Sequence, residues 1–176
     1  GEISIEMLLE CNVEYVIIGH SERRHIFHEN NELIGKKMST VNNAGMKPIL
    51  CIGETLDEMN NGKTYVIIEE QIIKGLTNVK SIDNIIIAYE PVWAIGTGLT
   101  ATAKKINEMH LFIRKILSSL YTNNESDKIP IIYGGSVNSD NANELISIDG
   151  VNGFLIGGAS LDVIKFTDVV KIVNEQ

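Results

Sequence analysis

Five short apolar segments recur along the chain, and each ends in small or polar residues. They lie at 15–22 (YVIIGHSE), 47–54 (KPILCIGE), 84–91 (NIIIAYEP), 129–136 (IPIIYGGS) and 153–160 (GFLIGGAS). In the third segment, three isoleucines at 85–87 follow one another without alternation, which is typical of a strand covered on both faces in a parallel sheet. The pattern predicts five strands built to one plan.

Helical segments are expected between these strands. They are predicted at about 29–43, 55–77, 102–121, 139–148 and 161–174. The segment 102–121 has the clearest amphipathic pattern, with Ile106, Met109, His110, Ile113 and Leu117 spaced for one face. Asn60-Asn61-Gly62 can end a short helix inside 55–77, and 122–128 (TNNESDK) is expected to be a polar loop. Alternation of strand and helix at this spacing predicts parallel βα units.

Five βα units fit either an open doubly wound sheet or part of a (β/α)8 barrel. The barrel is favoured because the last two strands both end in Gly-Gly and because the residues with the most chemistry lie at strand ends. These residues are His20, Glu22, Glu90, Ser136, Gly157 and Gly158. Barrel active sites lie at the carboxyl ends of the strands, whereas an open sheet concentrates its ligand at one switch point.

The length of the sequence agrees with part of a barrel. Eight units take about 250 residues, so five would take about 160. The 176 residues are therefore predicted to form a single α/β domain, 1–176, which is a partial (β/α)8 barrel of about five C-terminal units. The first three units are expected to be missing from this sequence.

Composition narrows the function classes. A hydrophobic content of 44% supports a real core, and neither a membrane span nor a signal peptide is visible. The two cysteines, Cys11 and Cys51, form no disulfide framework, so a cytoplasmic setting is expected. A formal charge of -8 argues against nucleic acid or an anionic membrane as partner. It leaves room for a small phosphate bound by backbone N–H groups.

The stretch 84–98 carries the strongest chemical signal. Glu90 leaves the strand next to Pro91, which restricts the backbone of Glu90 to extended geometry and so aims its carboxylate. Four apolar residues at 92–95 then stand on a loop between Pro91 and the glycines Gly96 and Gly98, a pattern that suits a lid. The stretch indicates a general base under a water-excluding lid. The alternative is an exposed loop with Glu90 paired to a surface cation.

His20 is the candidate partner of this base. It ends a strand and precedes a polar segment that can open a short helix, where the helix dipole favours the neutral imidazole as a hydrogen-bond donor. Glu22 can act as a second acid, but a salt bridge with Arg23 or Arg24 explains it equally well. The other histidines, at positions 25, 28 and 110, are interpreted as ordinary.

The two Gly-Gly pairs are candidate phosphate sites. Gly134-Gly135-Ser136 and Gly157-Gly158 let the backbone approach an anion, and the following segments offer helix N-termini. Gly96, on the lid, can close a third side. Two such pairs on consecutive final strands match the phosphate site of barrels after strands seven and eight. Cys51, inside an apolar run, is expected to be a buried core thiol that supports the site.

Four motifs together carry a family resemblance. YVIIGHSERR, AYEPVWAIGTG, YGGSV and GFLIGGASL occur in the order and spacing of the triosephosphate isomerase family, which the sequence resembles over essentially its whole length. The resemblance implies a TIM barrel and interconversion of dihydroxyacetone phosphate and D-glyceraldehyde 3-phosphate through an enediolate, in glycolysis and gluconeogenesis. It implies that Glu90 abstracts the proton between the two carbons and that His20 shuttles a proton between the enediolate oxygens.

The resemblance also assigns the binding residues and partners. Gly96, Ser136, Gly157 and Gly158 would hold the phosphate through backbone N–H groups, and residues 91–98 would form the lid. It implies no metal or organic cofactor, a triose phosphate as the small-molecule partner, no nucleic-acid or membrane partner, and a homodimer in the full-length family.

This sequence departs from the family at several points. The family also uses an Asn and a Lys at the end of its first strand, which this sequence does not include, and Glu22 would lie near that Lys. The family's dimer is built largely around a loop just before Gly1. His28 stands where a Gly is commoner, and Leu99 where a Lys is common at the second hinge of the lid. Two alternatives therefore stay open: another phosphosugar barrel enzyme, and an inactive fragment that binds phosphate weakly or needs the missing portion.

Overall fold

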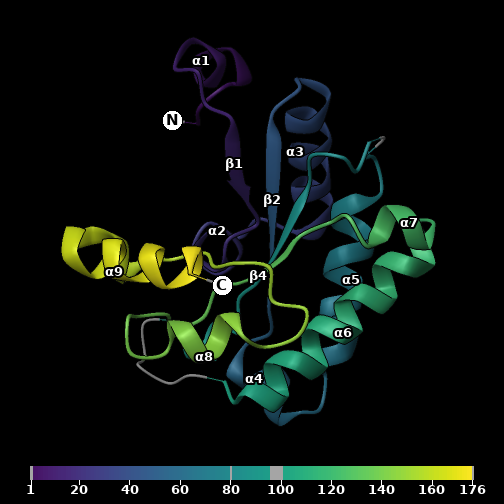
Figure 1. Cartoon of the computed structure of the whole chain (residues 1–176). Helices are drawn as coiled ribbons and strands as arrows, with labels where there is room; N and C mark the ends of the chain where they lie inside the picture. Colours follow the sequence, from purple (N-terminus) through teal and green to yellow (C-terminus); the bar gives the residue numbers. More distant parts are fainter. Residues whose placement is uncertain (1, 80, 96–100, 176) are drawn as a thin grey trace.

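The chain folds around a four-stranded parallel sheet in the computed structural model, which describes residues 2–79, 81–95 and 101–175 (Figure 1). The strands are β1 (Tyr15–Ile18), β2 (Lys47–Ile52), β3 (Ile86–Tyr89) and β4 (Ile131–Tyr133). They lie in sequence order, and each pairs in parallel with the next. The predicted α/β fold with parallel strands is confirmed, and four of the five predicted strands are present.

The strand register brings the carboxyl ends of the strands together. Ile18 pairs with Leu50, and Tyr89 pairs with both Ile52 and Tyr133. The residues that follow these positions therefore gather at one edge of the sheet. This is the edge at which the sequence places its chemistry.

The fifth predicted strand, 153–160, is wrong as a regular strand. It makes one isolated parallel bridge, between Phe154 and Tyr133, and then enters a 3-10 turn, η2 (Gly158–Leu161). Backbone bonds from Tyr133 N to Gly153 O (3.0 Å) and from Leu155 N to Tyr133 O (2.9 Å) hold it beside β4. Gly153 has a φ of 153°, outside strand geometry, and no strand of the described ranges pairs with the far side of this segment.

The predicted helices are confirmed with small changes in their ends. They are α3 (Asn31–Asn43), α4 (Leu56–Asn60), α5 (Thr64–Leu76), α6 (Ala103–Leu120), α8 (Ala142–Ile146) and α9 (Val163–Asn174). The break between α4 and α5 falls within the predicted Asn60-Asn61-Gly62, since Asn60 ends α4 and Gly62 has a φ of 67°. The predicted face of α6 is buried, since Ile106, Met109 and His110 are at most 2% exposed.

Three short helices complete the described structure. The segment after His20 forms α2 (Ser21–His25), as its polar pattern allowed, whereas α1 (Ile5–Glu10) was not predicted. The segment 122–128, expected to be a loop, contains α7 (Asn123–Ser126). Thr122 and Glu125 form a reciprocal capping box there, which satisfies the first backbone N–H groups and so stabilises a single turn.

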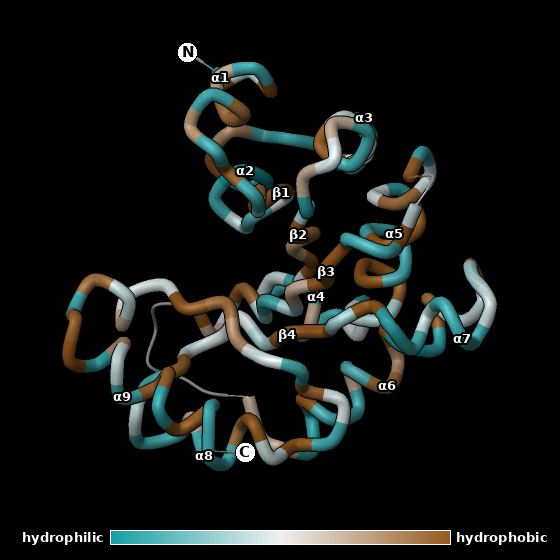
Figure 2. Tube along the Cα trace, turned by 45° about the horizontal axis from the view of Figure 1, so that its top comes forward, coloured by the Kyte–Doolittle hydropathy of each residue, from teal (hydrophilic) through white to brown (hydrophobic). Residues whose placement is uncertain are grey.

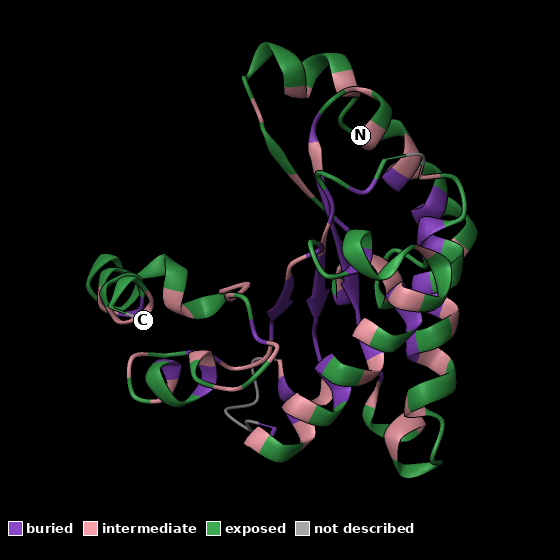
Figure 3. Cartoon of the chain, turned by 45° about the vertical axis from the view of Figure 1, so that its right-hand side comes forward, coloured by how far each residue is buried: buried purple, intermediate pink, exposed green. Residues whose placement is uncertain are grey.

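The core lies on both faces of the sheet (Figure 3). On β2, Leu50 and Ile52 face the helices, while Ile49 and Cys51 belong to a smaller cluster on the opposite face. Strands β2 to β4 are thus buried on both sides, as non-alternating apolar runs predict. β1 pairs with β2 alone, and its Ile17 is 51% exposed.

An apolar surface is exposed at the end of the chain. Figures 1 and 2 show α9 apart from α5 and α6, and its first turn carries hydrophobic residues. Leu161, Val163 and Ile164 are 90%, 78% and 70% exposed. Neighbouring exposed apolar side chains of this kind favour association.

We expect the isolated chain to self-associate through this surface and to have marginal stability. Light scattering after size-exclusion chromatography should detect species larger than a monomer, and L161K/I164K should reduce them. V66K, on α5 at a valine that is 65% exposed, is the matched control and should change nothing. A monomer with a sharp, reversible melt would contradict the prediction.

Candidate active site

A cavity of about 380 Å³ opens at the carboxyl edge of the sheet. It brings together residues from the ends of β1, β3 and β4 and from the segment after Gly153. Its lining includes His20, Glu90, Ile95, Gly134, Gly135, Ser136, Gly157 and Gly158. The structure therefore places the candidate residues His20, Glu90, Ser136, Gly157 and Gly158 around one space.

Glu90 lies at the centre of this arrangement. It follows Ala88 and Tyr89 of β3, is 3% exposed, and donates its backbone N–H to Ile52 O (2.7 Å). A Cβ on Gly134 would lie 2.7 Å from Glu90 Cγ. Gly134 thus makes room for the carboxylate, a function that sequence reasoning did not assign to it. The alternative of a surface Glu90 is wrong, because the side chain is buried.

His20 meets Glu90 directly. His20 Nε2 lies 3.4 Å from Glu90 Oε1. His20 is the N-cap residue of α2, and its Nδ1 accepts a hydrogen bond from the backbone N–H of Glu22 (3.4 Å). In a neutral imidazole with Nδ1 as acceptor, Nε2 carries the proton. This tautomer points an N–H donor at the carboxylate and into the cavity.

The surroundings of Glu90 set its acidity. Burial raises the pKa of Glu90, and this effect exceeds the opposing effects of His20, the Cys51 thiol, the Ser21 backbone N–H and Arg24. A carboxylate with a raised pKa is a stronger base, and it still ionises because several donors face it.

The raised pKa makes stability depend on pH in a defined direction. An ordinary Glu has a pKa of about 4.3, so the folded chain keeps the Glu90 proton where the unfolded chain has lost it. Glu90 therefore stabilises the fold less as the pH rises through its folded-state pKa. We expect Glu90→Gln to gain stability relative to wild type between pH 4 and pH 8 in urea unfolding. Glu108→Gln, at an exposed residue of α6, is the control, and a pH-independent difference for Glu90→Gln would contradict the prediction.

Cys51 is the buried core thiol that the sequence predicted. It is 0% exposed on β2 and belongs to the cluster on the inner face of the sheet. Burial raises the pKa of Cys51, and the neighbouring Glu90 carboxylate raises it further. Cys51 thus contacts the candidate base while it stays an uncharged core residue.

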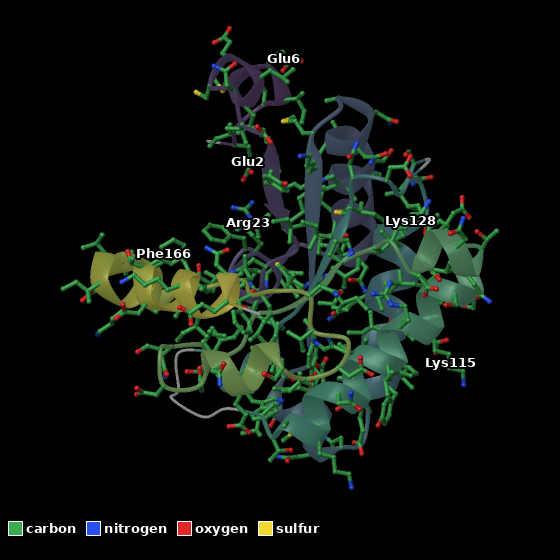
Figure 4. All side chains as sticks on the ribbon, in the orientation of Figure 1. Glu2, Glu6, Arg23, Lys115, Lys128 and Phe166 are labelled. Carbon is green, nitrogen blue, oxygen red and sulfur yellow. The ribbon has the colours of Figure 1, made fainter. Side chains whose placement is uncertain are left out.

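Glu22 lies on the surface, outside the cavity lining. Its predicted salt bridge with Arg23 or Arg24 is wrong, because both arginines bind other groups. Arg23 pairs with Glu29 and with Glu2 (3.0 Å), and Figure 4 labels Arg23 and Glu2 beside β1. The part of Glu22 that supports the site is its backbone N–H, which binds His20 Nδ1.

Sequence reasoning missed a second buried carboxylate, Glu54. It is 0% exposed and accepts hydrogen bonds from Trp93 Nε1 (2.9 Å) and from Tyr89 Oη (3.2 Å). Trp93 lies in the 3-10 turn η1 (Val92–Ala94) that begins the predicted lid, and Lys105 Nζ lies 4.7 Å from the centre of its ring. The sequence did contain a signal for Glu54: the apolar run 47–54 ends in this glutamate, just as the run 84–91 has Glu90 immediately before its final proline. Gly96, Gly98 and Leu99 lie outside the described residues.

The candidate phosphate residues form the open side of the cavity. Gly157 and Gly158 are exposed, and a Cβ on either would meet nothing within 4 Å. Ser160 Oγ donates to Gly157 O (2.6 Å), and Asn141 Nδ2 donates to Ser136 O (3.0 Å). These bonds occupy carbonyl oxygens, which leaves this wall able to present N–H groups to an anion.

The described residues contain neither a cluster of metal-ligating side chains nor a membrane-spanning helix. Within these ranges, no three His, Cys, Asp or Glu side chains are grouped to hold a metal ion. None of the helices in the same ranges is long and apolar enough to span a membrane.

The chain is an α/β protein whose parallel sheet carries a buried carboxylate, Glu90, and an imidazole, His20, at its carboxyl edge. Residues 1–173 match the sequence model of the family described as "Triosephosphate isomerase". The chain belongs to the triosephosphate isomerase family.

Three relatives illustrate this membership. The triosephosphate isomerase of Thermodesulfovibrio yellowstonii is 50% identical over 171 residues, which are 97% of this chain and 69% of that protein. The enzyme of Aquifex aeolicus is 52% identical over 171 residues, which are 97% of this chain and 69% of that protein. The enzyme of Chlamydia trachomatis serovar D is 46% identical over 174 residues, which are 99% of this chain and 64% of that protein. The chain thus spans 64% to 69% of the length of these relatives.

Proposed function

We propose that the chain carries the site of a triosephosphate isomerase, which interconverts dihydroxyacetone phosphate and D-glyceraldehyde 3-phosphate in glycolysis and gluconeogenesis. The observation that carries the proposal is the contact between His20 Nε2 and Glu90 Oε1 (3.4 Å) at one cavity. Aldose–ketose interconversion needs one group that removes a proton from carbon and another that moves protons between oxygens. A buried carboxylate and an N–H donor aimed at the same space supply both.

Each residue has a distinct part in the proposed reaction. Glu90 abstracts the proton from the carbon beside the carbonyl, and burial makes its carboxylate the stronger base. His20 donates from Nε2 to the developing enediolate oxygen and then moves a proton between the two oxygens. The Glu22 backbone N–H holds Nδ1 as the acceptor and so fixes the imidazole.

The phosphate belongs at the opposite wall of the cavity. Ser136, Gly157 and Gly158 line that wall, and backbone N–H groups there bind an anion without a cationic side chain. Gly96 on the lid would complete this site. The lid begins at η1, where the bond from Trp93 to Glu54 anchors it to the sheet.

The broader assembly belongs to the same proposal. The four ordered parallel strands and the bridge at Phe154 support an arc of a (β/α)8 barrel, with residues 1–176 as one domain. A homodimer is proposed from the family alone. The reaction needs no metal or organic cofactor, and a cytoplasmic setting suits the free thiols of Cys11 and Cys51.

The cavity wall favours a second candidate function, phosphate binding without turnover. Among the described residues that line the cavity, none is Lys or Arg. The family places a substrate-binding Lys at the end of its first strand. If no other polypeptide supplies that cation, the chain would bind phosphate and leave the sugar unreacted.

One experiment separates the candidates. Turnover of D-glyceraldehyde 3-phosphate is measured for the 176-residue chain alone and mixed with a peptide carrying the family's first three βα units. Binding of inorganic phosphate is followed in parallel by phosphorus NMR line width. Turnover in either sample supports the isomerase, and phosphate binding without turnover supports the second candidate. If the samples show neither turnover nor phosphate binding, both candidate functions are overturned.

A further inference from the structure

Arg24, on α2, binds only uncharged acceptors. Its Nε donates to Gly19 O (2.7 Å), its Nη1 to Asn31 Oδ1 (2.6 Å) and its Nη2 to Cys51 O (2.9 Å). Within the described ranges, no carboxylate lies at ion-pair distance from it, whereas its neighbour Arg23 pairs with two. Burial lowers the pKa of Arg24 to about 10, so the guanidinium stays charged at neutral pH.

Two of the three acceptors, Gly19 O and Cys51 O, lie at the ends of β1 and β2, and the third, Asn31 Oδ1, lies at the start of α3. Gly19 directly precedes His20, and Cys51 lies near the end of β2 (Lys47–Ile52), next to Glu90. Gly19 has a φ of 75°, and a Cβ there would lie 3.0 Å from Arg24 Nη2 and 3.2 Å from Cys51 O. The turn that delivers His20 is therefore closely fitted around this guanidinium.

The guanidinium also acts on the carboxylate through its charge. Four groups near Glu90 lower its pKa, in decreasing order of effect: His20, the Cys51 thiol, the Ser21 backbone N–H and Arg24. Cys51 and the amide act on Glu90 as hydrogen-bond donors, whereas Arg24 acts through the charge that its guanidinium keeps at neutral pH.

We propose that Arg24 is a positioning residue for the acid–base pair: the planar fork of its guanidinium ties the turn at Gly19, which precedes His20, to Cys51 on β2, the residue beside Glu90. The expected effect of Arg24 on turnover rests on the proposed function. The effect of Arg24 on the ionisation of Glu90 does not, and it can be measured without turnover.

Three variants separate the fork from the charge. Arg24→Met removes both, and Arg24→Lys keeps the charge but loses the planar fork. Arg23→Met is the matched control, because it removes the same charge from the next residue of α2, whose partners are Glu2 and Glu29. Arg24→Gln, which keeps amide donors and loses the charge, replaces Arg24→Met if that variant does not fold.

The first measurement is the Glu90 ionisation midpoint, from carbon NMR of labelled glutamate with Glu90→Gln as the assignment standard. The midpoint should move up in Arg24→Met or Arg24→Gln, stay near wild type in Arg24→Lys, and not move in Arg23→Met. Equal midpoints in the Arg24 and Arg23 charge-removal variants would overturn the proposal.

The second measurement is turnover by whichever sample is active. Both Arg24→Met and Arg24→Lys should lower kcat about tenfold or more with little change in KM, since a displacement of 1 Å can cost about 100-fold. Unchanged kcat in Arg24→Lys would overturn the role of the fork. A wild-type chain without turnover speaks against the proposed function, while the midpoints still decide whether Arg24 acts on Glu90.

Discussion

Glu90→Gln should lower kcat for triose phosphate by about 10²- to 10⁴-fold, the range that a positioned general base supplies. Glutamine keeps the shape of the side chain but cannot take a proton from carbon. The burial of Glu90 and its contact with His20 at 3.4 Å make compensation by bulk water inefficient. The measurement is kcat in the sample that turns over D-glyceraldehyde 3-phosphate, with the chain alone or complemented.

Two further variants make this result specific. Glu108→Gln removes the same charge from an exposed position of α6 and should leave kcat unchanged. Glu90→Asp keeps the carboxylate but withdraws it by one methylene, and it should fall between wild type and Glu90→Gln. Turnover of Glu90→Gln within threefold of wild type would show that another group is the base.

Gly53→Ala should be the most destabilising single substitution among the glycines next to the site. A Cβ at this position would lie 1.8 Å from the backbone oxygen of Glu90. Gly53 is also fixed by Gln71, whose Oε1 accepts from Gly53 N (2.8 Å) and whose Nε2 donates to Gly53 O (3.1 Å). Neither side can move freely, so we expect a loss of about 3 kcal/mol or more in the free energy of unfolding, the upper end for overpacking.

The matched control is Gly75→Ala, inside α5. There a Cβ would meet the Leu50 Cδ2 methyl at 2.8 Å, which is the end of a flexible side chain, and alanine favours the helix. Urea unfolding should give a much smaller loss for Gly75→Ala than for Gly53→Ala. Equal losses would mean that the close backbone contact between Gly53 and Glu90 is not the cause of the destabilisation by Gly53→Ala.

Local sequence patterns predicted the elements whose signals are local. Apolar runs gave β1 to β4, and Asn61-Gly62 gave the break between α4 and α5. The run at 153–160 failed because its composition is that of a strand, while the φ of Gly153 and the pairing of the segment depend on the tertiary structure. The single helical turn α7 was not predicted, because it is stabilised by one capping box and has no hydrophobic periodicity.

The sequence could predict those site residues that directly follow the carboxyl end of a strand. His20 ends the first apolar run and Glu90 ends the third, and a parallel sheet brings the carboxyl ends of its strands to one edge, so their approach could be expected. Glu54 also ends an apolar run, but its hydrogen-bond partner Trp93 lies far along the sequence, so that partner could not be predicted from the local pattern. The function of Gly134 as space for Glu90, and of Arg24 as a link between strands, depends on atomic distances that no sequence pattern encodes.

The order of the strands has a consequence for how the molecule opens. β1 has a neighbour on one side, whereas β2 and β3 are each paired on both sides. Backbone amides of β1 should therefore exchange with solvent deuterium sooner than those of β2 and β3, because edge segments open with smaller free energies than the centre. His20 follows the early-opening strand, and Glu90 follows a late-opening one. Mild denaturant should thus separate His20 from Glu90 while most of the secondary structure still stands.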